Sequence, residues 1–121
     1  MEISENVKSV KARIARAAYL CGRDPKEITL VAASKMNDAE RVKEAVLAGV
    51  DACGENRVQE LLEKYEKGAY EGAPLHFIGT LQKNKVKYLV GKVSLIHSVD
   101  SFSLLEETEK QAAKRDLVQD V

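Results

Sequence analysis

The stretch ITLVAASK, residues 28–35, decides the fold of this chain. Its first six residues are almost continuously apolar, which is typical of a parallel β-strand that is buried on both faces. The apolar run stops at Ser34 and is followed at once by Lys35, a cation that is rarely buried without a partner. The stretch therefore predicts an α/β fold whose first strand ends at a lysine.

Outward from this stretch, short apolar segments alternate with helical patterns at a period of about 20 to 25 residues. Further strands are predicted over 50–53, 75–78 and 93–97, and residues 117–121 resemble the start of another. Helices are predicted over 4–21, 38–48, 56–65, 81–90 and 101–112. The expected N-terminal caps are Ser4, Asn37 or Asp38, Asn56 with Gln59 in a capping box, and Asp100 or Ser101.

Strands that alternate with helices predict a parallel sheet with right-handed crossovers. Two architectures fit: the first half of a TIM-type (β/α)8 barrel, whose usual size is about 250 residues, or an open flavodoxin-like sheet. In the barrel interpretation, residues 1–121 form one βα-repeat unit, a half-barrel with an N-terminal helix in front, truncated before or within its fifth strand.

Composition and charge exclude several classes of protein. The chain is 45% apolar, and its 19 Lys and Arg balance its 19 Asp and Glu, so neither a nucleic-acid partner nor a membrane partner is expected. No apolar run approaches the roughly 18 residues that a membrane span needs. We expect a cytoplasmic protein in which Cys21 and Cys53 are reduced core thiols.

Chemistry in both architectures collects where the strands end. Lys35 is there either as an amine that attacks a carbonyl or as a surface lysine. Asn56 either opens an anion-binding helix N-terminus, against the charge of Glu55, or is a plain cap. His76 and His97 either contact a ligand or are satisfied histidines of the core or edge, and no spacing suggests a metal site. The basic residues Lys83, Lys85, Lys87 and Lys92 are expected on a solvated helix face.

Four phrases together carry a family resemblance: LVAASK at 30–35, GENRVQE at 54–60, LHFIGTLQKNKVKYL at 75–89 and IHSVDS at 96–101. In this order they resemble the N-terminal half of the pyridoxal phosphate homeostasis proteins, often called YggS-like. The resemblance implies a βα barrel related to the cofactor domain of alanine racemase, with pyridoxal 5′-phosphate held as a Schiff base on Lys35. We accordingly predict a cofactor site that contains Lys35, Asn56, His76 and Ser98, with no catalytic residue and no metal.

The departures from the family concern Met36, Cys53 and above all length. Met36 stands where many relatives have a small hydroxylated residue, and Cys53 where an aromatic residue is common. The resemblance implies a whole protein about twice as long, whose other half carries the later strand ends that grip the phosphate in such barrels.

Three functions follow from these observations. The first is cofactor homeostasis, in which Lys35 holds the cofactor reversibly and no acid/base pair is needed. The second is a pyridoxal phosphate-dependent, racemase-like enzyme on the same barrel. The third is a half-barrel that associates with a second copy and binds no ligand, since half a barrel leaves strand edges uncovered.

Overall fold

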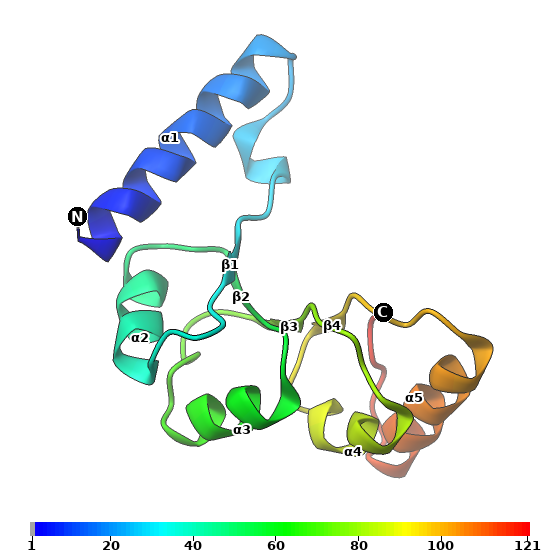
Figure 1. Ribbon diagram of the computed structural model, residues 1–121. Coiled ribbons are helices and arrows are strands. Elements are labelled where there is room, and N and C mark those ends of the chain that lie inside the picture. Colours follow the sequence, from blue (N-terminus) through cyan, green and yellow to red (C-terminus); the bar gives the residue numbers. More distant parts are fainter. Residues whose placement is uncertain (1) are drawn as a thin grey trace.

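The computed structural model describes residues 2–121 as alternating helices and strands around one sheet (Figure 1). The strands are β1 (Val31–Ala33), β2 (Ala52–Glu55), β3 (Leu75–Phe77) and β4 (Leu95–Ile96). The helices are α1 (Ile3–Leu20), α2 (Ala39–Leu47), α3 (Val58–Glu66), α4 (Val86–Leu89) and α5 (Phe102–Lys114), with 3-10 turns η1 (Pro25–Glu27) and η2 (Lys83–Lys85).

The strand order identifies the architecture. All neighbouring strands are parallel, and the order in the sheet is β1-β2-β3-β4, the order of the sequence. A flavodoxin-like sheet would place its first strand between two others, so that alternative is wrong. Helices α2 to α5 follow one another along one side of the sheet, while α1 extends away from it (Figure 1). The chain therefore forms the four-stranded, curved half of a βα barrel.

The segment 117–121 begins to extend this sheet, as predicted. A parallel bridge joins Leu95 to Asp120, and the Ile96 amide donates to the Asp120 carbonyl at 3.2 Å. Residues near Asp120 thus begin to pair with β4 as a fifth strand of the sheet would.

Several predicted boundaries are wrong. The strands are shorter than expected, and the helix predicted over 81–90 is a 3-10 turn followed by the single turn of α4, which ends at Leu89 because Val90 adopts an extended conformation. Ser4 does not cap α1, which begins one residue earlier at Ile3. Asp38 and Ser101 do cap, accepting hydrogen bonds from the Arg41 and Leu104 amides. The four lysines at 83, 85, 87 and 92 are exposed, as expected.

The core lies between the sheet and the helices. Phe77, Leu61, Leu89 and Ile96 are fully buried in it. Because strand side chains alternate, Phe77 packs under the helices while His76 faces the inner side of the sheet, as predicted. Cys53 is buried as expected, but Cys21 is exposed rather than in the core, because it lies at the end of α1, which extends away from the sheet (Figure 1).

Gly79, directly after β3, permits a close approach of two strand ends. A Cβ built there would collide with the backbone carbonyl of Asn56. We expect Gly79→Ala to lower the free energy of unfolding by about 3 kcal/mol, since the obstacle is backbone that cannot move aside. Urea denaturation measures this. Gly22→Ala is the matched control: at φ +75° with open space around it, it should cost only about 1 to 2 kcal/mol.

An equal effect of the two substitutions would contradict the packing described for Gly79.

Among residues 2–121, the structure contains no helix with the length and apolar character that a membrane crossing requires.

Candidate functional site

Lys35, Asn56 and Ser98 lie at the edge of the sheet where the strands end, whereas the fourth predicted site residue, His76, lies within β3. Three backbone hydrogen bonds define this edge: Ser34 N–H to Gly54 C=O at 3.0 Å, Ile78 N–H to Glu55 C=O at 2.9 Å, and His97 N–H to Phe77 C=O at 2.9 Å. Lys35, Asn56, Gly79 and Ser98 each follow directly after one of these rungs. We call this edge the rim. The prediction that Lys35 shares it with Asn56 and Ser98 is confirmed.

Lys35 lies in the tight turn between β1 and α2. Its side chain is exposed, and the next residue, Met36, has a positive φ of 64° and is 91% exposed. Ser34 on the other side is buried. The turn therefore presents its lysine to solvent between one anchored residue and one residue in a left-handed conformation.

A buried polar network lies directly behind this turn. Lys64 Nζ donates to Glu60 Oε2 at 2.6 Å, to the Ser34 carbonyl at 2.7 Å and to Glu55 Oε2 at 3.0 Å. The same Glu55 oxygen accepts the Ser34 and Tyr70 hydroxyls, both at 2.6 Å. The lysine thus uses all three of its donors, and β1, β2 and α3 are tied together behind the rim.

This network was not among the predictions from the sequence. Its signal was Lys64, a charged residue three positions after Leu61 on the apolar face of α3, with Glu60 four residues before it. A cation on a buried face requires a buried anion. Glu55, which also lies beside the predicted site, supplies it.

The surroundings of Glu55 differ from those predicted from the sequence. Its charge was expected to disfavour an anion near Asn56, but its side chain is fully buried and paired with Lys64, at 3.0 Å. Its negative charge is therefore offset within the network.

Neither buried nucleophile near the network is suited to act as a base. Burial, followed by the charge of Glu55, raises the pKa of the Cys53 thiol to about 11. Burial and the hydrogen bond to Glu55 raise the pKa of Tyr70 far above its usual value. Both groups stay protonated at neutral pH.

Asn56 is not the helix cap that the capping-box pattern predicted. Helix α3 begins at Val58 with Arg57 in the cap position, and no side chain caps it. Instead, Asn56 Oδ1 is buried and has no hydrogen-bond partner among residues 2–121. The same holds for Ser98 Oγ at the end of β4. A third such atom, Glu55 Oε1, belongs to the buried network, and the two at the rim are what a polar ligand would pair with.

His76 and His97 form a pair on the inner side of the sheet. His97 Nε2 lies 3.0 Å from His76 Nδ1, and the ring centroids are 5.0 Å apart. His76 is buried and His97 is exposed. Burial, and then the neighbouring His97, lower the pKa of His76, so that it is neutral at pH 7.

This pair predicts a pH dependence of stability. Because the folded state holds the pKa of His76 below its ordinary value of about 6.5, the unfolded chain binds more protons as the pH falls. The stability of the parent chain should therefore decline from about pH 6.5 downward, and His76→Asn should show a smaller decline. Urea denaturation at pH 7.5 and pH 5.5 tests this. Equal declines in the two proteins would contradict it.

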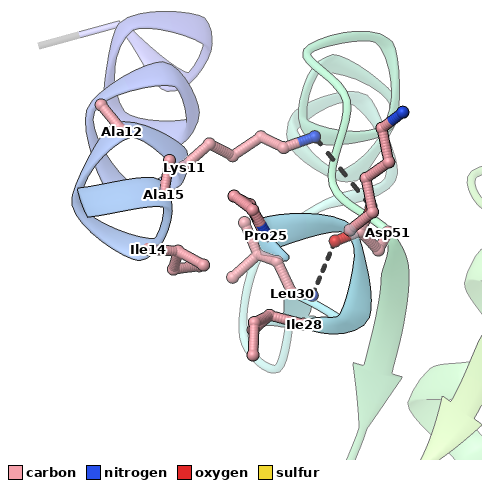
Figure 2. A pocket seen from close by; sticks show the side chains of 9 residues that line it. Lys11, Ala12, Ile14, Ala15, Pro25, Ile28, Leu30 and Asp51 are labelled. Carbon is pink, nitrogen blue, oxygen red and sulfur yellow. Dashed lines mark hydrogen bonds and ion pairs between the residues drawn. The ribbon is translucent and has the colours of Figure 1, made fainter. Parts of the chain in front are cut away.

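A hollow lies near the other ends of the strands, where β1 and β2 begin (Figure 2). It measures about 530 Å³, and Ile14 and Ala15 on α1 and Ile28 and Leu30 before β1 help to line it. Asp51 closes one side by accepting a hydrogen bond from the Leu30 amide at 2.7 Å. Since it adjoins the beginnings of the strands, this hollow is separate from the rim.

Comparison with known proteins shows which proteins this chain resembles in sequence. No family model matches the chain. It is 46% identical over all of its 121 residues to a pyridoxal phosphate homeostasis protein of Aquifex aeolicus, of which it covers 53%. It is 39% identical over 109 residues, 90% of the chain, to the protein of that name in Pseudomonas aeruginosa, of which it covers 47%.

Solved structures give the same result for the fold. An unknown protein from Bifidobacterium adolescentis superposes with a TM-score of 0.88 at 35% identity, over 97% of this chain and 52% of that one. PipY of Synechococcus elongatus, solved with pyridoxal phosphate bound, gives a TM-score of 0.70 at 36% identity, over 85% of this chain and 49% of PipY. The chain spans about half the length of these proteins. By sequence the chain is similar to about half of the pyridoxal phosphate homeostasis proteins, and its fold matches about half of PipY.

Proposed function

We propose that this chain acts in pyridoxal phosphate homeostasis and that Lys35 holds the cofactor as a Schiff base. One observation carries the proposal: Lys35 follows the first strand at a rim where Asn56 Oδ1 and Ser98 Oγ are buried and unpaired among the described residues. The pyridoxal phosphate in PipY, a structure 36% identical to this chain, supports it.

The residues at the rim fit such a group. The exposed amine of Lys35 is accessible to an aldehyde, which condenses with a neutral amine. Asn56 and Ser98 are positioned to pair with polar atoms of the cofactor, and the neutral His76 faces the inner side of the sheet beneath them. When bound, the cofactor would supply its aldehyde and its electron-accepting ring.

We further propose that the chain carries the cofactor rather than catalysing a reaction with it. Catalysis at an amino-acid α-carbon requires a poised acid and base. Cys53 and Tyr70 are held protonated, with Tyr70 bound to Glu55 at 2.6 Å. The names of the relatives, which are homeostasis proteins, support the same conclusion.

The strength of binding follows from how much of the barrel is present. In such barrels the phosphate is held by loops after strands 7 and 8, whereas this sheet has four strands and the start of a fifth. A complete barrel would hold the cofactor by two attachments, the lysine and the phosphate site. With the lysine alone, the 121-residue chain should bind the cofactor weakly.

Visible absorption tests the proposal. The purified 121-residue chain, titrated with pyridoxal phosphate, should become yellow with saturation only at high cofactor concentration. Absence of any saturable absorption would contradict the proposal. Conversion of L- to D-alanine by the loaded protein would instead support the racemase-like enzyme.

We also propose that the 121-residue chain pairs with a second copy and resides in the cytoplasm. The outer edge of β1 has no neighbouring strand among the described residues, and Ala33 on that strand is exposed. A second copy could cover this edge and the inner face. Sedimentation equilibrium should show a dimer, and a monomer at high concentration would contradict the pairing.

A further inference from the structure

The turn that carries Lys35 is held from behind by one carboxylate. Glu60 Oε2, on the first turn of α3, accepts a hydrogen bond from the Met36 amide at 2.6 Å. The same oxygen accepts from Lys64 Nζ at 2.6 Å, and Lys64 also holds the carbonyl of Ser34 at 2.7 Å. The two residues that flank Lys35 are thus both anchored to α3, 24 and 30 residues further along the chain.

Met36 needs this anchor because of its backbone conformation. Its φ of 64° lies in the left-handed region, which a residue with a long side chain adopts only at a cost in energy. Its side chain is 91% exposed, so packing does not offset that cost. The hydrogen bond from its amide to a carboxylate does, since bonds to charged acceptors are the strong ones.

We propose that Glu60 is a positioning residue for Lys35: it fixes the turn that holds the lysine amine at the rim, without touching the cofactor. The inference rests on the proposed function. Glu60 is charged where it acts: burial alone would raise its pKa, but the hydrogen bonds from Lys64 and Met36 outweigh burial and lower it.

The step that depends on this position is the addition of the neutral Lys35 amine to an aldehyde carbon, with loss of water to form the C=N bond. Borohydride then delivers a hydride to that carbon and fixes the label as a secondary amine. The rate of label formation at Lys35, relative to the exposed Lys67, therefore reports how well the turn is held.

Three variants of the 121-residue chain test the inference with pyridoxal phosphate and borohydride at neutral pH. Glu60→Ala should slow selective labelling at Lys35 about tenfold, the change that corresponds to one lost hydrogen bond to a charged group, and should speed hydrogen exchange at the Met36 amide. Glu60→Gln keeps an acceptor oxygen for Met36 without its charge and should recover part of the rate. Glu63→Ala, an exposed glutamate on the same helix, is the control and should match the parent.

The outcomes separate the inference from the function it rests on. Lys35 labelling in Glu60→Ala equal to that of the parent, or a loss that Glu60→Gln does not recover even in part, would overturn the positioning role alone. A parent in which Lys35 is labelled no faster than Lys67 would overturn the positioning role and the proposed function together. Urea denaturation confirms that each variant is folded, which is expected because Lys64 keeps its bonds to Ser34 and Glu55.

Discussion

Lys35→Ala is expected to abolish the visible absorption that pyridoxal phosphate produces with this chain. The reason is chemical: the C=N bond that shifts the absorption requires the exposed Lys35 amine, whereas the Lys64 amine behind the turn is buried and donates to Glu60, Ser34 and Glu55. Because Lys35 is exposed and its side chain is in none of the ion pairs of the structure's described part, the free energy of unfolding should change by less than about 0.5 kcal/mol.

The measurement is an absorption titration beside a urea denaturation curve. Lys67→Ala, which removes an exposed lysine at the end of α3, is the matched control and should keep the absorption of the parent. If Lys35→Ala retained the absorption, the amine would have to be assigned to another lysine.

Lys64→Met should destabilise the fold by about 3 to 5 kcal/mol, the usual cost of breaking a buried ion pair from one side. The substitution leaves Glu55 fully buried with a charge that no cation offsets, and leaves the Ser34 carbonyl with the Asn37 amide as its hydrogen-bond donor. Since small domains have only about 5 to 15 kcal/mol of stability, this variant should be close to unfolding at room temperature.

The double variant Glu55→Gln/Lys64→Met separates the charge from the packing. It removes both charges, keeps an oxygen for the Ser34 and Tyr70 hydroxyls, and should recover most of the lost stability in urea denaturation. A Lys64→Met variant that loses less than about 1 kcal/mol would show that the network contributes little.

The strands and helices could be predicted from the sequence because each strand has a recognisable pattern of apolar residues. The apolar run before Lys35 predicted a parallel strand, and the alternation of His76 and Phe77 predicted which side chain faces the helices. The choice between barrel and open sheet required the structure, since both follow from the same pattern of elements. Strand order, which is a property of long-range pairing, decided it.

The site was accessible only in part, for a physical reason. Position along the chain places Lys35, Asn56 and Ser98 at strand ends, but it does not show what their side chains contact. Asn56 has the sequence of a helix cap, yet its oxygen is unpaired and α3 begins two residues later. The pairing of Lys64 with Glu55, nine residues away across a strand end, depends on how α3 packs against β2.

The central claim, that Lys35 is the residue that holds the cofactor, is tested most directly by trapping it. The 121-residue chain is incubated with saturating pyridoxal phosphate, reduced with borohydride and digested, and the labelled peptides are identified by mass spectrometry. We predict one dominant label, on Lys35, in the parent and none on that peptide in Lys35→Ala. Labels spread over the exposed lysines without preference for Lys35 would contradict the claim.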